Sequence, residues 1–182
     1  MAGTLTGKRV AILLTDGFEQ AEMVQPRTAL HAEGAQTTLI APHAGQVKAW
    51  HSPSWGDTFS VDVPLDQAKV EDYDALLLPG GVMNPDHLRT NAAAVQFVKA
   101  FFEAGKPVAA LCHAPWTMVN ADVLRGRTLT SWPSLHTDIQ NAGGNWVSKQ
   151  VVRDGNLVTC RMPADIPAFN PQMIDLFATW QQ

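Results

Sequence analysis

The sequence predicts an α/β domain with a mostly parallel sheet and helices on both faces, a three-layer α/β/α sandwich. Short apolar runs, typical of strands buried on both faces, alternate with amphipathic helical stretches along the chain. One of these runs, Val108–Leu111, leads directly into a tight turn with Cys112 at its apex. The length of 182 residues suits one such domain with a sizeable core.

Strands are predicted where apolar runs end at turn-forming residues. These runs are Arg9–Leu14, Thr37–Ala41, Tyr73–Leu78, Val108–Leu111 and Arg127–Trp132. The segment Val47–Val63 alternates irregularly and carries Trp50, which indicates a β-ribbon beside the sheet. Asp154-Gly155 between two short apolar runs is typical of a hairpin.

Helices are predicted between the strands from their capping residues. The first starts at about Pro26, which suits a first helical position, and stops at Gly34. Asn91 caps a second helix that ends before Gly105. Further helices are expected at Trp116–Val123, at Leu135–Asn141 and from Asn170-Pro171 onward.

Composition excludes several classes of function. A hydrophobic content of 46% with 16% charge describes a globular domain, and a net charge of −4 argues against nucleic-acid binding. The chain shows no signal peptide and no apolar window long enough to span a membrane, so we expect a cytoplasmic protein without a membrane partner. Residues 1–7 are expected to be a flexible N-terminus and residues 8–182 a single domain.

The turn after Val108–Leu111 has the pattern of a nucleophile elbow. Ala110 and Ala114 supply the small residues that a cramped strand-to-helix turn requires on either side of Cys112. A helix N-terminus and a protonated His113 would both lower the thiol pKa. The alternative is a buried, inert cysteine at the end of a core strand.

In a flavodoxin-like strand order, the first strand neighbours the third and the third neighbours the fourth. Ligands then bind at the carboxyl ends of these strands. Three loops are thereby placed together: Asp16–Glu19, Gly80–Arg89 and Cys112–Pro115.

Residues in these loops could assist a cysteine nucleophile. A desolvated Glu19 would stay protonated and donate a hydrogen bond to the thiolate, or be only a capping carboxylate. Gly80 and Gly81 permit close approach of a ligand and could supply one side of an oxyanion hole, or form only a tight turn. His113 could act as general base, oriented by Asp86.

The remaining thiol and imidazole groups are expected to be bystanders. His87 and His136 are predicted at the surface, and Cys160 is predicted to be structural in a strand. No metal-ligand spacing is present, so we expect neither a metal nor a cofactor. Two cysteines do not make a disulfide framework, which fits a reducing compartment.

The motifs together resemble the PfpI family of intracellular cysteine peptidases, in the superfamily of the parkinsonism-associated deglycase. The matching segments are Asp16–Glu19, Leu77–Gly81, Asn84–Arg89, Ala110–Pro115, Leu124–Arg127, Asn141–Gly143 and Asp154–Thr159. The resemblance spans residues 8 to 180 and implies a flavodoxin-like fold.

The resemblance also implies roles for individual residues. Cys112 would be the nucleophile and Glu19 its hydrogen-bonding partner, while the N–H groups of Gly81 and His113 would form the oxyanion hole. Asp86 stands where relatives carry an acid, often Glu, that reaches the histidine of a neighbouring subunit. A homo-oligomer, dimer or hexamer, is therefore implied.

Two departures from the family pattern concern the pocket. Ala114 replaces the usual glycine after Cys-His, and Trp116 stands where a smaller polar residue is common. Ala114 still meets the requirement for a small residue. Trp116 is expected to narrow the substrate pocket, which Gly80 also lines.

Three functions remain open at this point. The first is a stress-protective enzyme of the glyoxalase or deglycase type, in which Cys112 attacks an α-oxoaldehyde or its early adduct on protein or nucleotide. The second is an intracellular cysteine peptidase acting on peptides with the same nucleophile. The third is a redox-sensing or holdase stress protein without turnover. We favour the first, because it demands least of the histidine geometry.

Overall fold

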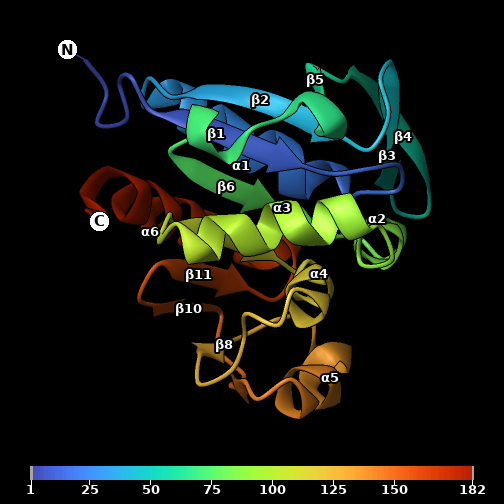
Figure 1. Ribbon diagram of the computed structural model, residues 1–182, viewed down its shortest axis with the longest axis vertical. Helices are drawn as coiled ribbons and strands as arrows, with labels where there is room; N and C mark the ends of the chain where they lie inside the picture. The colour runs from blue at the N-terminus through green and yellow to red at the C-terminus, as the bar shows by residue number, and fades with distance from the viewer. Residues whose placement is uncertain (1, 182) are drawn as a thin grey trace.

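A seven-stranded sheet forms the centre of the molecule, with the strand order β10-β11-β7-β6-β1-β2-β5. The computed structural model describes residues 2–181 (Figure 1). The strands are β1 (Arg9–Leu13), β2 (Gln36–Ala41), β5 (Val63–Pro64), β6 (Ala75–Leu78), β7 (Val108–Leu111), β10 (Val151–Asp154) and β11 (Leu157–Cys160). All neighbouring pairs are parallel except the β10–β11 hairpin. The predicted order, with the first strand beside the third and the third beside the fourth, is confirmed as β1-β6-β7.

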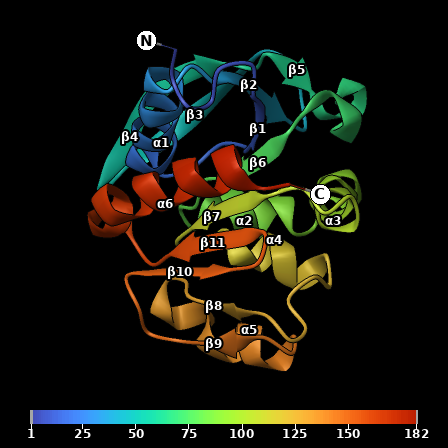
Figure 2. The same cartoon turned by 90° about the vertical axis from the view of Figure 1, so that its left-hand side faces the viewer.

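Helices cover both faces of the sheet and bury two apolar cores. The helices α1 (Gln20–Ala32) and α6 (Ile166–Thr179) lie on one face, while α3 (Ala92–Glu103) and α4 (Pro115–Asn120) lie on the other (Figure 2). Two shorter helices, α2 (Met83–Leu88) and α5 (His136–Asn141), and four 3₁₀ turns complete the described helical elements. The 3₁₀ turns are Leu65–Gln67, Val70–Asp72, Pro133–Leu135 and Pro163–Asp165. The three-layer α/β/α prediction is therefore confirmed.

Two small sheets lie outside the main one. The predicted β-ribbon is present as the hairpin β3 (Gln46–His51) and β4 (Ser54–Ser60). The predicted strand at Arg127–Trp132 shrinks to β8 (Thr128–Leu129), which pairs with β9 (Asn145–Trp146). Its remainder bends toward the main sheet, because the N–H of Trp132 donates to the carbonyl of Cys112 over 2.9 Å.

Two helices begin earlier than their prolines suggest. The helix α1 starts at Gln20, with Pro26 in its interior, and α6 starts at Ile166, with Pro171 in its interior. A proline removes one hydrogen bond of the helix, but burial of the apolar faces of both helices against the sheet outweighs that loss. The segment Met83–Leu88, expected as a loop, is the short helix α2.

The segment before β1 packs onto the domain. Leu5 is fully buried and its N–H donates to the carbonyl of Glu33 over 2.8 Å, so this part of the predicted flexible N-terminus is held in place. Met1 lies outside the described residues. No helix within residues 2–181 has the length and the hydropathy needed to cross a bilayer.

Candidate active site

Cys112 occupies a strained elbow between β7 and α4. Its φ of 60° lies in the left-handed region, which is costly for a residue with a side chain. The elbow is also crowded by the loop after β6: a Cβ on Gly80 would lie 2.8 Å from the Cβ of Cys112 and 2.6 Å from the carbonyl oxygen of Leu111. A glycine at position 80 is therefore required for the two strand ends to meet. The predicted nucleophile elbow matches this geometry.

The carboxyl group beside the thiol belongs to Glu22, which corrects the assignment of Glu19 as its partner. Glu22 lies in the first turn of α1, is fully buried and lies beside Cys112, where its carboxyl group affects the pKa of the thiol. Its Oε1 atom also accepts the N–H of Gly81 over 3.1 Å. Glu19 is the N-cap of α1, three residues earlier, and lines the mouth of the pocket instead.

A sequence signal for Glu22 exists, but the late predicted start of the helix hid it. Once α1 begins at Gln20, the residues Glu22, Pro26 and Leu30 recur every four positions on its buried face. A carboxylic acid inside an apolar helical stripe seldom occurs without a partner. The pattern therefore singles out Glu22 as functional only when the helix boundary is known.

Burial keeps both acids of this pair in their protonated forms. Desolvation, with repulsion from Glu19, raises the pKa of Glu22 to about 8. Burial raises the pKa of the Cys112 thiol, and the charge of Glu22, when that carboxyl is ionised, raises it further. Hydrogen bonds from the N–H groups of Gly81 and His113 oppose this increase. The expected lowering of the thiol pKa is wrong, because the cost of desolvation exceeds the effect of these donors.

His113 contacts the sulfur as a neutral imidazole. Its Nδ1 atom lies 3.1 Å from the Sγ of Cys112, and burial lowers the pKa of His113 to about 4. The ring is stacked on Trp132 with 5.6 Å between centroids, and Trp116 covers it with 5.2 Å between centroids. Two indoles thus orient the imidazole, and the expected imidazolium beside the thiol is absent at neutral pH.

Asp86 does not orient His113 within one chain. It is exposed on α2, and no hydrogen bond joins it to His113 among residues 2–181. Three further residues were predicted from the sequence to have no part in the site. His87 is exposed, and His136 stacks on Trp146. Cys160 is fully buried in β11.

The thiol lies at the floor of a pocket of about 380 Å³. Its lining is Glu19, Glu22, Trp50, Ser52, Gly81, Val82, Cys112, His113, Trp132 and Pro163. Neither Gly80 nor Trp116 belongs to the lining, contrary to expectation. Gly80 supports the elbow from behind, and the indole Nε1 of Trp116 donates to Asp138 over 2.8 Å.

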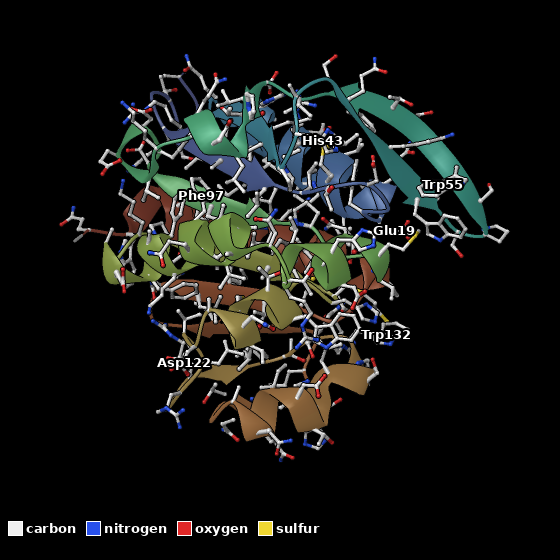
Figure 3. The ribbon with its side chains drawn as sticks, turned by 45° about the vertical axis from the view of Figure 1, so that its right-hand side comes forward. Glu19, His43, Trp55, Phe97, Asp122 and Trp132 are labelled. Carbon is white, nitrogen blue, oxygen red and sulfur yellow. The ribbon has the colours of Figure 1, made fainter. Side chains whose placement is uncertain are left out.

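The aromatic walls of the pocket are Trp50 and Trp132, which sequence reasoning missed as site residues. Trp50 comes from strand β3 of the β3–β4 ribbon, and Trp132, labelled in Figure 3, comes from the chain after β8. Neither segment carries a motif. Their tryptophans are brought to the pocket by backbone hydrogen bonds, from Trp50 N–H to Phe18 over 2.7 Å and from Trp132 N–H to Cys112 over 2.9 Å.

Comparison with known proteins places this geometry in a family. A family model described as the DJ-1/PfpI family matches residues 8–176. The chain is 39% identical over 168 residues to a deglycase of Pyrococcus abyssi, covering 92% of this chain and 98% of that protein. It is 41% identical over 172 residues to general stress protein 18 of Bacillus subtilis, covering 93% and 98%.

A solved structure shares the same architecture over nearly the whole chain. Drosophila melanogaster DJ-1beta is similar with a TM-score of 0.85 at 26% identity, covering 99% of this chain and 92% of that one. The structural match agrees with the flavodoxin-like fold described above. The chain therefore belongs to the DJ-1/PfpI family.

Proposed function

We propose that the protein is a stress-protective cysteine-dependent enzyme of the glyoxalase or deglycase type. Its substrates would be small α-oxoaldehydes or their early adducts. The observation that carries the proposal is the group Cys112–Glu22–His113, with the sulfur 3.1 Å from an imidazole nitrogen at the floor of a small pocket. Relatives named deglycase and general stress protein, at about 40% identity, support the same class of function.

The chemistry begins with attack of Cys112 on the aldehyde carbon. The thiol proton passes to His113 Nδ1 as the carbon–sulfur bond forms, because a free thiolate is disfavoured in this buried site. The carbonyl oxygen accepts hydrogen bonds from the backbone N–H groups of Gly81 and His113. The same two N–H groups hydrogen bond to the sulfur before the substrate binds. The product of this step is a hemithioacetal.

The remaining steps are an internal redox exchange and a hydrolysis. One proton leaves the aldehyde carbon and another reaches the ketone carbon through an enediol, so the first carbon is oxidised and the second is reduced. His113 and the protonated Glu22 are placed to carry these protons. Water then cleaves the thioester, giving a 2-hydroxy acid and the free Cys112. No external oxidant or cofactor is needed.

Assembly into a homo-oligomer remains part of the proposal. Asp86 is exposed on α2, where a neighbouring subunit can reach it. In such an assembly its carboxylate would orient the His113 of the partner subunit, as the family resemblance implies.

The compact pocket favours small carbonyl substrates over peptides. A peptidase needs an extended groove around its nucleophile, whereas Trp50 and Trp132 stand at the opening of a pocket of about 380 Å³. A redox sensor needs an exposed thiolate, whereas Cys112 is 6% exposed and the pKa of its thiol is raised.

The test is production of lactate from methylglyoxal in a buffer free of amines and added thiols. Replacing Cys112→Ala is expected to abolish turnover, since the hemithioacetal cannot form. The matched control Cys160→Ala removes the other thiol and is expected to retain turnover. Equal rates for the wild-type protein and Cys112→Ala would refute the proposed function.

A further inference from the structure

The pocket has a buried floor and a more open rim with different chemistry. The floor holds the reacting groups, which are almost fully buried: Glu22, Gly81, Cys112 and His113. The rim consists of the half-buried or exposed lining residues Glu19, Trp50, Ser52, Val82, Trp132 and Pro163. Any substrate larger than a small aldehyde places its non-reacting end against this rim.

The rim carries one formal charge, the carboxylate of Glu19. Among residues 2–181, no lysine or arginine lines the pocket. Although Glu19 is the N-cap of α1, its side chain makes no capping hydrogen bond, and it forms no salt bridge among residues 2–181. Partial burial raises its pKa, opposed only by His51. A half-buried carboxylate without a counter-charge is a favourable partner for a cation from solution.

Two indoles flank this carboxylate. Trp50 pairs with Glu19 through a backbone bridge, and its ring is held edge-on by Trp55 with 5.5 Å between centroids. Trp132 is 38% exposed, and one face of its ring stacks on the ring of His113. Figure 3 shows Glu19 and Trp132 on the same side of the molecule, from α1 and from the segment after β8. Both indoles line the pocket together with Glu19.

We propose that the rim is a cation subsite, in which the Glu19 carboxylate and the indoles of Trp50 and Trp132 hold an ammonium or guanidinium group of the substrate. Indole faces attract cations through their quadrupole, and a guanidinium can stack on them while it pairs with a carboxylate. A phosphate-bearing carrier is disfavoured by the same carboxylate. The inference rests on the proposed function. Such a subsite favours carbonyl compounds that carry a cationic group over carbonyl adducts of a nucleotide.

The test uses two arylglyoxals that differ only in charge. The 4-(2-trimethylammonioethyl) and 4-(3,3-dimethylbutyl) derivatives of phenylglyoxal have substituents of the same shape. Two methylene groups separate the ammonium from the ring and limit its effect on carbonyl reactivity, so the ratio of the kcat/KM values reports on the charge. For the wild-type protein we expect a preference for the cationic compound of about tenfold. A ratio near one for the wild-type protein would overturn the subsite.

Variants of the rim locate the preference. Glu19→Gln is expected to bring the ratio close to one, whereas Glu103→Gln, an exposed carboxylate on α3, is expected to keep the wild-type ratio. The ratio is the proper readout because Glu19 also raises the pKa of Glu22, an effect that acts on both substrates alike. Because the aromatic face of Trp132 contributes to the subsite, Trp132→Phe is expected to retain part of the preference for the cationic compound, and Trp132→Ala is expected to lose it.

A binding measurement separates this inference from the proposed function. Phenyltrimethylammonium has no carbonyl, so calorimetric titration reports on the rim without catalysis. Binding that weakens in Glu19→Gln, in a protein that turns over neither glyoxal, would uphold the subsite and refute the proposed function. Turnover of both glyoxals without charge preference, and no calorimetric binding, would uphold the function and refute the subsite.

Discussion

At the scale of single residues, Glu22 is the side chain on which the reactivity of the thiol depends. It is fully buried, it accepts a hydrogen bond from the N–H of Gly81, and it lies beside Cys112, where it affects the pKa of the thiol. A carboxylate in this position would repel a thiolate, but a protonated acid stabilises it by donating a hydrogen bond. The raised pKa of Glu22, to about 8, is therefore what lets an acid sit beside this nucleophile.

Glu22 is expected to make the protein less stable as the pH rises. Its carboxyl is protonated in the folded protein up to a pKa of about 8, whereas in the unfolded chain it ionises near the model value of 4.5. The folded state thus holds the extra proton between these values, and stability falls as pH rises through that window. The difference in unfolding free energy between the wild-type protein and Glu22→Gln should fall by a few kcal/mol from pH 5 to pH 8 in urea titrations. A flat difference would contradict the assignment.

The environment of His113 yields a second prediction at this scale. Desolvation by its surroundings lowers the pKa of His113 to about 4, and Trp132 supplies one stacked face. Trp132→Ala admits water to that face, so the His113 pKa should rise toward the model value of 6.5. Trp132→Phe should leave it near the wild-type value. Titration of the imidazole by NMR measures both, and an unchanged pKa in Trp132→Ala would exclude this role of Trp132.

At the scale of elements, the site is made where loops after β1, β6 and β7 meet. The loop after β6 has to pass under the elbow, which is why Gly80 has no room for a side chain. The β3–β4 ribbon adds a wall from outside the main sheet, through the bond from Trp50 N–H to Phe18. Each of these elements therefore contributes to the site by positioning one chemical group, and not by carrying a sequence motif.

Gly80→Ala should disturb the elbow as well as lower the stability. The new Cβ would meet Leu111 and Cys112 at 2.6 and 2.8 Å, which is overpacking against backbone, with a typical cost of roughly 1–3 kcal/mol. Thiol alkylation of Cys112 should change in rate, because the sulfur is displaced from Glu22 and His113. The control Gly105→Ala meets no atom within 4 Å, although its φ is +65°, and should alter stability without altering alkylation. Equal alkylation rates in both variants would contradict the steric role of Gly80.

At the scale of the whole molecule, one sheet serves two cores. Phe169 of α6 is fully buried on one face and Phe101 of α3 on the other. Because every strand of the parallel core contributes side chains to both faces, neither core can unfold while the other keeps its sheet.

We therefore expect one unfolding transition whichever face is damaged. Phe101→Ala and Phe169→Ala should each cost about 3–5 kcal/mol and shift the same transition. Urea titrations followed by tryptophan fluorescence and by far-ultraviolet circular dichroism should coincide for both variants. Separate midpoints for the two probes in either variant would show that the layers unfold independently.

The core strands and the elbow could be predicted because both leave local marks on the sequence, whereas the order of the strands was expected from the flavodoxin-like topology. Buried parallel strands read as short apolar runs, and the cramped turn at Cys112 demands Ala110 and Ala114 on its flanks. The helix starts could not, because Pro26 and Pro171 carry strong local signals that packing overrides. The late predicted start at Pro26 kept Glu22 out of consideration, while the place of Glu19 in the first loop and the family resemblance assigned the role to Glu19.

The sequence by itself determined the α/β class and the cysteine at the elbow, since these follow from periodicity and from small residues at fixed spacing. The order of β1, β6 and β7 was expected from the flavodoxin-like topology, and the structure confirms it. Only the tertiary structure decided which acid meets the sulfur, that His113 is held between indoles, and that Trp50 and Trp132 frame the pocket. The physical reason is that protonation state and wall composition depend on burial by residues distant in the chain, which no local pattern records.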